Sequence, residues 1–212
     1  EIKGKLGDQV TLVAVSKTKP IEDILSAYAA GVRDFGENYV QELRDKQPVL
    51  PGDIRWHFIG HLQSNKVKYM ASYVYLIQSV DSAGLLEEIN KQALKNGRVI
   101  HVLLQVHVAK EETKFGWNVN ELEEWSSLGI WRNYHGVSIM GVMGMASFVD
   151  DSAQVSEEFE DVKACFDQLN RTVFKDNPLT QLSMGMSGDW PLAVEKGSNV
   201  IRVGSALFGS RN

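Results

Sequence analysis

Residues 10–17 read VTLVAVSK, a short and nearly continuous apolar stretch, rich in valine, that ends in Lys17. A continuous apolar run of this length is typical of a strand buried on both faces, as in a parallel sheet. Pro20 then opens residues 21–30, where apolar residues recur at helical spacing, and Gly31 follows as a stop signal. The stretch therefore predicts a strand followed by a helix, the repeating unit of parallel α/β folds.

The same alternation continues along the chain. Seven further strands are predicted, at residues 32–35, 54–59, 74–79, 99–108, 136–141, 179–183 and 199–203, with helices predicted up to residue 46 and at 83–95, 150–170 and 189–196. Eight such units favour a single (β/α)8 barrel over residues 1–212, a length near the low end for that fold. A doubly wound open sheet is the alternative, although no GxGxxG motif follows the first strand.

Composition narrows the class of protein. Apolar residues make up 43% and charged residues 23%, and 22 basic against 27 acidic residues give a net charge of −5, which argues against non-specific nucleic-acid binding. The single cysteine, Cys165, excludes an internal disulfide and a multi-cysteine metal site, and we expect a buried, inert thiol. The sequence shows no apolar run long enough to span a membrane and no signal peptide, so we expect a cytoplasmic protein without a membrane partner.

Several charged or titratable residues are predicted to be structural. Glu157 and Glu158, like Asp150 and Asp151, are expected on a solvated helix face. His57, His61 and His107 lie in or near predicted strands, where a histidine is most often a hydrogen-bonded core residue. No pair of histidines has the spacing of a metal site, so no metal is predicted.

Polar residues follow the carboxyl ends of the predicted strands, where a barrel places its functional site. They are Lys17, Asn38, His61, Ser147, Ser187 and Ser205. Lys17 is the most informative of them, because desolvation at a barrel mouth favours the neutral amine, which is the nucleophile of Schiff-base chemistry. A solvated lysine at a strand end is the alternative interpretation.

A phosphate site is predicted after the last two strands. Residues 183–187 (SMGMS) and Gly204-Ser205 follow them, and glycine with serine lets backbone N–H groups and hydroxyls approach a phosphate. Ordinary turn chemistry uses the same residues. Arg202 interrupts the last apolar strand, either to face a ligand or to form a structural ion pair. A lysine, a phosphate cradle and an arginine together fit pyridoxal 5′-phosphate, which offers an aldehyde, a phosphate and a pyridine nitrogen.

Six long stretches resemble the family of pyridoxal phosphate homeostasis proteins (YggS/PROSC). They are VAVSKTKP (13–20), FGENYVQEL (35–43), WHFIGHLQSNK (56–66), QVHVAKEETKFG (105–116), LSMGMSGDW (182–190) and IRVGSALFG (201–209). The resemblance implies a barrel similar to the N-terminal domain of bacterial alanine racemase. His107 departs from the pattern, since many members have asparagine there.

The resemblance also implies roles for site residues. Lys17 would carry the cofactor as an internal aldimine, and Arg202 would lie near its pyridine nitrogen. The phosphate would be held by Ser187, Gly204 and Ser205, with a backbone N–H from Met186. Asn38 and His61 would lie along the flank of the cofactor.

The sequence favours a cofactor-binding protein over an enzyme. A permanently protonated Arg202 would leave the pyridine nitrogen unprotonated and the ring a weak electron sink. A racemase needs an acid–base group on each face of its substrate, and only Lys17 is a clear candidate. The family resemblance implies that alanine racemase adds a C-terminal domain and a tyrosine from its partner, which we do not expect here.

We therefore expect reversible cofactor binding in a monomer that takes part in intracellular homeostasis, with apo-enzymes as recipients. A small fold-type III racemase is one alternative function. A Schiff-base or sugar-phosphate lyase, with no cofactor, is another.

Overall fold

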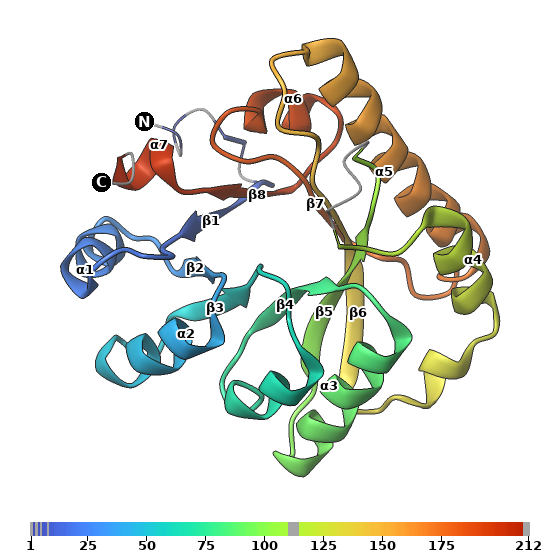
Figure 1. The fold of residues 1–212 in the computed structure, drawn as a ribbon, viewed down its shortest axis with the longest axis horizontal. Coiled ribbons are helices and arrows are strands. Elements are labelled where there is room, and N and C mark those ends of the chain that lie inside the picture. The colour runs from blue at the N-terminus through green and yellow to red at the C-terminus, as the bar shows by residue number, and fades with distance from the viewer. Residues whose placement is uncertain (1, 3, 5, 8, 110–114, 210–212) are drawn as a thin grey trace.

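The computed structural model describes residues 2, 4, 6, 7, 9–109 and 115–209. In these residues eight parallel strands close into a barrel, each paired with the next in chain order and the last with the first (Figure 1). At the closing seam Leu12 lies opposite Ile201 and Ala14 opposite Val203. The closed sheet confirms the predicted (β/α)8 barrel and excludes the doubly wound alternative, whose open sheet has two edges.

The strands are short and agree in order with those predicted. Their bounds are β1 (Thr11–Val15), β2 (Asp34–Glu37), β3 (Arg55–Phe58), β4 (Leu76–Val80), β5 (Ile100–Val106), β6 (Val137–Gly144), β7 (Gln181–Ser183) and β8 (Val200–Val203). The α-helices are α1 (Ile21–Ala29), α2 (Val40–Lys46), α3 (Ala83–Lys95), α4 (Val119–Ser127), α5 (Ser152–Thr172), α6 (Trp190–Glu195) and α7 (Ser205–Phe208). Short 3-10 helices are η2 (Gln47–Val49), η3 (Ser64–Tyr69) and η4 (Ile130–Asn133).

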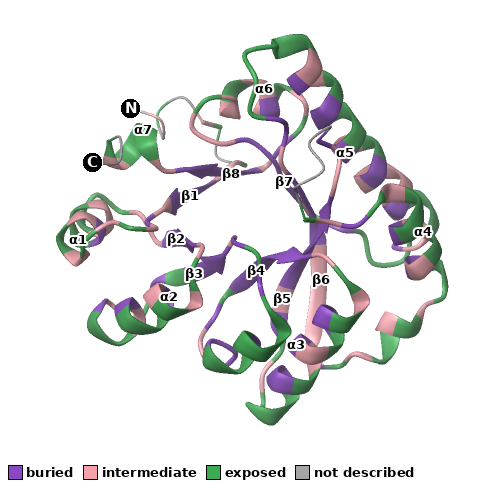
Figure 2. Cartoon of the chain, in the orientation of Figure 1, coloured by how far each residue is buried: buried purple, intermediate pink, exposed green. Residues whose placement is uncertain are grey.

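Apolar side chains fill the layer between the barrel and its outer helices. Phe35 of β2, Leu43 of α2 and Phe159 of α5 are fully buried in this layer. Figure 2 shows the consequence, with most strands buried, the first half of β6 of intermediate exposure, and the outer sides of the helices exposed. Burial of the apolar layer is the main force that holds the helices against the sheet.

The barrel interior is partly polar. On β8, Ile201 and Val203 pack outward with Leu12, so Arg202 between them points into the barrel, as the two-residue period of a strand requires. Leu76, Leu103 and Met143 form a separate apolar cluster.

Helix α4 was not predicted. Its sequence, VNELEEWSS, places Val119, Leu122 and Trp125 three residues apart, and these three apolar side chains pack on the core, so the helical spacing was visible but short. Within the described residues, no helix is both long enough and apolar enough to cross a membrane.

Candidate functional site

A cavity of about 650 Å³ opens at the carboxyl ends of the strands. Its lining comes from residues far apart in sequence, at the ends of β1, β2, β3, β6, β7 and β8. Seven of the eight predicted site residues line it, namely Lys17, Asn38, Met186, Ser187, Arg202, Gly204 and Ser205. The topology of the barrel therefore brings the predicted lysine and the predicted phosphate loops to one cavity.

Lys17 is half-buried, and both of its neighbours in the chain are held in place. The preceding Ser16 is fully buried, and its hydroxyl donates to Glu37 Oε1 at 2.6 Å. The following residue, Thr18, has a left-handed φ of 62°, which is uncommon for a residue other than glycine. Its backbone N–H donates to Glu42 Oε1 at 2.6 Å. These bonds fix the turn from which the Lys17 side chain projects.

One buried ammonium group ties these contacts together. Lys46 Nζ lies 2.8 Å from Glu37 Oε1 and 2.5 Å from Glu42 Oε1, and it donates to the carbonyl oxygen of Ser16 at 2.7 Å. Burial raises the pKa of Glu37, while the hydrogen bonds from Lys46 and Ser16 oppose that rise. Glu37 Oε2 is buried with no hydrogen-bond partner. The cluster therefore depends on Lys46 to balance the carboxylates behind Lys17.

The predicted phosphate loops meet at Ser187. Its Oγ accepts a hydrogen bond from the backbone N–H of Gly204 at 3.1 Å and a longer one, 3.5 Å, from that of Ala206. A Cβ added to Gly204 would lie 3.3 Å from Val15, so the chain passes close to β1 at this point. The Met186 N–H donates to Asp189 Oδ1 at 2.5 Å and is thus already engaged within its own loop.

Arg202 is 3% exposed and makes its side-chain hydrogen bonds to neutral oxygens. Nη1 donates to Ser183 Oγ, and Nη2 donates to the carbonyl oxygen of Gly144 at 3.0 Å. Burial lowers the pKa of Arg202 to about 10, against the opposing effect of the Asp189 carboxylate. The guanidinium therefore remains charged at neutral pH while facing the cavity. Ser183, part of the predicted phosphate loop, instead lies fully buried beneath it.

Asn38 and His61 differ in their positions. Asn38 lines the main cavity, and its buried Oδ1 has no hydrogen-bond partner. His61 lines an adjoining cavity of about 410 Å³, which Asn38 also borders. Its Nδ1 lies 3.1 Å from Asp81 Oδ2, and its ring stacks on Phe115 with the centroids 3.6 Å apart. These two contacts hold His61 outside the lining of the cavity that contains Lys17.

Sequence reasoning missed an anchor for the loop after β6. Glu158 was expected on a solvated helix face, and this prediction is wrong, because the residue is 2% exposed. Its carboxylate accepts from the Ser147 N–H at 2.5 Å and from the Ser147 hydroxyl at 2.8 Å. Glu158 lies three residues after Val155 and four before Val162, so its spacing on the buried stripe could have revealed it.

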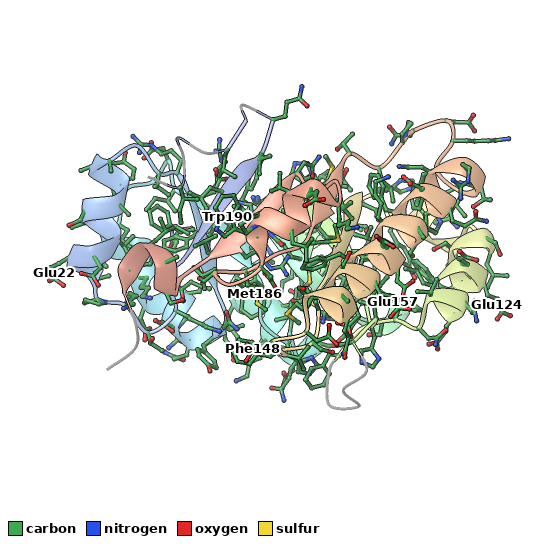
Figure 3. The ribbon with its side chains drawn as sticks, turned by 90° about the horizontal axis from the view of Figure 1, so that it is seen from above. Glu22, Glu124, Phe148, Glu157, Met186 and Trp190 are labelled. Carbon is green, nitrogen blue, oxygen red and sulfur yellow. The ribbon has the colours of Figure 1, made fainter. Side chains whose placement is uncertain are left out.

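The anchored loop carries an exposed aromatic residue to the cavity. Phe148 directly follows Ser147 and is 92% exposed, yet it lines the cavity together with Met186 of the loop after β7. Figure 3 labels both residues. This role could not be predicted, since nothing in the sequence pattern separates Phe148 from other loop residues.

The fold and the cavity define a class, a (β/α)8 barrel whose mouth gathers one strand-end lysine, a glycine–serine loop and a buried arginine. The chain belongs to the family of the alanine racemase N-terminal domain, whose model matches residues 1–212. The family resemblance predicted from sequence is thereby confirmed.

Curated relatives carry the name pyridoxal phosphate homeostasis protein. That of Aquifex aeolicus is 39% identical over 201 residues, covering 94% of this chain and 86% of its own length. The human protein is 34% identical, covering 96% of this chain and 78% of its own length.

Solved structures agree with this assignment. PipY of Synechococcus elongatus, solved with pyridoxal phosphate bound, is 39% identical with a TM-score of 0.89, covering 98% of this chain and 96% of that one. Alanine racemase of Clostridium difficile is 15% identical with a TM-score of 0.73, covering 99% of this chain and 55% of that one, and it shares the fold.

Proposed function

We propose that this protein binds pyridoxal 5′-phosphate reversibly at the mouth of the barrel and takes part in intracellular homeostasis of that cofactor. The observation that carries the proposal is the meeting of Lys17, Ser187, Gly204 and Arg202 in one cavity. Pyridoxal phosphate bound to the similar PipY, and the names of the curated relatives, support it.

The cavity fits this cofactor in size and in chemistry. A volume of about 650 Å³ is within the usual range for a small-molecule site. The backbone N–H groups of Gly204 and Ala206 donate to Ser187 Oγ, and with the Ser187 hydroxyl they would turn to a bound phosphate as its donors. Lys17 supplies the amine for the aldehyde, and the unpartnered Asn38 amide oxygen is available to a polar group on the ring.

Bound pyridoxal phosphate supplies an aldehyde that condenses with an amine, releasing water, and a ring that withdraws electrons. The surroundings disfavour strong use of that electron sink. Arg202 stays charged, since even its lowered pKa of about 10 is well above neutrality, and a guanidinium donates hydrogen bonds without giving up a proton. A ring nitrogen facing it would stay unprotonated, so we propose binding and release without robust turnover.

A racemase remains the alternative, and the described cavity lining argues against it. A second acid–base group would have to face the substrate opposite Lys17. The ionisable residues among the described lining are Lys17, Lys19 and Arg202. Lys19 Nζ donates to the Phe208 carbonyl oxygen at 2.9 Å, which holds it at the edge of the cavity.

Three further expectations belong to this proposal. We propose that residues 1–212 act as one cofactor-binding domain, that the protein is a cytoplasmic monomer, and that apo-enzymes requiring the cofactor receive it. The exposed Phe148 beside the cavity is consistent with a recipient approaching that side of the mouth.

The test is the visible absorbance of the purified protein with added pyridoxal phosphate, compared with Lys17→Ala and with the control Lys68→Ala, an exposed lysine. A cofactor band in the parent and control that vanishes in Lys17→Ala supports the proposal. No band in the parent contradicts it, and borohydride trapping of a carbonyl substrate on Lys17 would then favour the lyase.

A second measurement separates a carrier from a racemase. Exchange of amino-acid α-protons in D2O, catalysed by the loaded protein, would favour the racemase. Transfer of the cofactor to an apo-enzyme without that exchange would favour the homeostasis role.

A further inference from the structure

A chain of hydrogen bonds crosses the barrel interior beneath the cavity. Arg202 Nη1 on β8 donates to Ser183 Oγ on β7, and Ser183 Oγ lies 2.7 Å from Gln78 Oε1 on β4. Gln78 Nε2 lies 3.1 Å from His57 Nδ1 on β3, and His57 Nε2 lies 2.9 Å from Asp34 Oδ1 on β2. Three side chains therefore connect the cavity to the opposite end of the barrel.

The far end of this chain is anchored by an ion pair. Arg55 Nε donates to Asp34 Oδ1 at 2.7 Å, and a second guanidinium nitrogen contacts the other carboxylate oxygen. Although burial opposes it, the hydrogen bonds from His57 and Arg55 lower the pKa of Asp34 to about 2. Asp34 is therefore ionised at neutral pH and can only accept hydrogen bonds.

We propose that His57, Gln78 and Ser183, here called the interior relay, are positioning residues that set the orientation of the Arg202 guanidinium at the cavity. The proposal rests on the proposed function, in which Arg202 meets the cofactor. The central argument is that Asp34 and Arg202, at the two ends of the relay, allow only one donor–acceptor direction for every hydrogen bond between them.

The direction follows from the chemistry of the ends. Because Asp34 only accepts, His57 Nε2 carries a hydrogen. Its Nδ1 accepts once Gln78 Oε1 faces Ser183, because the Gln78 amide nitrogen then donates to His57. Because Arg202 only donates, Ser183 Oγ accepts from it and must send its own hydrogen to Gln78 Oε1. The reversed Gln78 amide would present a donor to Ser183 and leave the serine hydrogen without an acceptor. One neutral His57 tautomer and one amide orientation satisfy all the members.

Burial makes this arrangement costly to break. Gln78 and Ser183 are 0% exposed, and His57 is 2% exposed. A buried polar group that loses its partner costs more free energy than a made hydrogen bond contributes, so the relay holds as a unit. Packing alone does not require this polar chain, because branched apolar side chains usually fill the interior of such barrels. We infer that the polar chain serves the orientation of Arg202.

The relay leaves the cavity side of Arg202 available. Ser183 and the Gly144 carbonyl engage one N–H on each terminal nitrogen of the guanidinium. A guanidinium has five N–H donors, so further donors remain for a molecule in the cavity. Without Ser183, the planar group would lose the contact that fixes its rotation.

The experiment compares Ser183→Ala with a matched control, Ser198→Ala. Ser198 is also a buried serine beside β7 and β8, but its hydroxyl bonds to backbone groups such as the carbonyl oxygens of Leu182 and Met184. We expect Ser183→Ala to weaken pyridoxal phosphate binding about tenfold, as for loss of a hydrogen bond to a charged group. We also expect it to shift the pH dependence of the absorbance band of the bound cofactor. Ser198→Ala should change neither.

Two readouts on the protein without cofactor test the relay independently. Long-range ¹H–¹⁵N correlation spectra should show His57 as the neutral tautomer with its hydrogen on Nε2. Nitrogen-15 NMR should show hindered rotation of the Arg202 guanidinium, released in Ser183→Ala and retained in Ser198→Ala. If Ser183→Ala fails to fold, Gln78→Met breaks the relay one link further away and should release the same rotation.

The outcomes separate the two proposals. A hydrogen on His57 Nδ1, or unchanged guanidinium rotation and cofactor affinity in a folded Ser183→Ala, would overturn the relay. Absence of pyridoxal phosphate binding in the parent protein would overturn the proposed function, while the tautomer and the guanidinium rotation would still decide whether the relay orients Arg202.

Discussion

Lys46 Nζ donates a hydrogen bond to the carbonyl oxygen of Ser16 at 2.7 Å, which ties α2 to the residue directly before Lys17. The same ammonium lies 2.8 Å from Glu37 Oε1 on β2. A buried cation in this position both compensates a buried carboxylate and fixes the turn that carries the candidate cofactor lysine. Stability and function are therefore expected to fail together when Lys46 is replaced.

We predict that Lys46→Met lowers the free energy of unfolding by about 3 kcal/mol, because it leaves Glu37 as a buried carboxylate without its cation. Urea denaturation measures the loss, and titration with pyridoxal phosphate should show weaker binding in the same variant. Lys68→Met, at an exposed position of η3, is the control and should change neither quantity. The double variant Glu37→Gln/Lys46→Met should recover part of the stability, and a lack of recovery would mean that the carboxylate is not the source of the loss.

Ser187→Ala should weaken binding of pyridoxal phosphate while leaving binding of pyridoxal, which has no phosphate, nearly unchanged. The Ser187 hydroxyl and the Gly204 N–H, now bonded at 3.1 Å, are the donors assigned to the phosphate. Losing one of them should reduce affinity for pyridoxal phosphate roughly tenfold. Fluorescence titration with both compounds measures the difference, with the exposed Ser64→Ala as control. Equal loss for the two compounds would show that Ser187 acts elsewhere than on the phosphate.

The barrel was predictable because its strands are buried on both faces and therefore form continuous apolar runs such as residues 10–16. The common location of Lys17, Ser187 and Arg202 followed from the same prediction, since the topology of a barrel brings strand ends together. The prediction of a hydrogen-bonded core residue is confirmed for His57, whose ring nitrogens are both engaged, and is wrong for His61, which is exposed.

The features that could not be predicted are contacts between residues that are far apart in the sequence. Gln78 and Ser183 lie 105 residues apart and meet only because β4 and β7 face each other across the interior. The position of His61 depends on its contacts with Asp81 and Phe115, which no sequence pattern indicates. Glu158 is the exception, because its position on the buried stripe of α5 was visible in the spacing.

Stability should fall between about pH 4 and pH 2 partly because of Asp34. Its pKa is lowered from 3.8 to about 2 in the folded protein, so the folded state holds fewer protons than the unfolded state in this range. A lowered carboxylate pKa contributes stability above the unfolded value, and this contribution disappears as the pH falls through the folded value. Thermal unfolding of the parent and of Asp34→Asn across this range measures the effect. The parent should lose its advantage over the variant as the pH drops, and parallel curves would contradict the assignment.

Cys165 should be unreactive until the protein unfolds. It is 2% exposed on the inner face of α5, and burial raises the pKa of its thiol to about 12. Because the thiolate is the reactive form, both its accessibility and its ionisation are suppressed in the folded state. A disulfide reagent such as DTNB at pH 8 should label Cys165 in only a small fraction of the native protein. In concentrated urea it should label Cys165 in all of the protein. A Lys68→Cys variant, with a second and exposed thiol, should react with one equivalent at once under native conditions. Rapid labelling of Cys165 itself in the native protein would mean that α5 leaves the barrel far more often than its packing indicates.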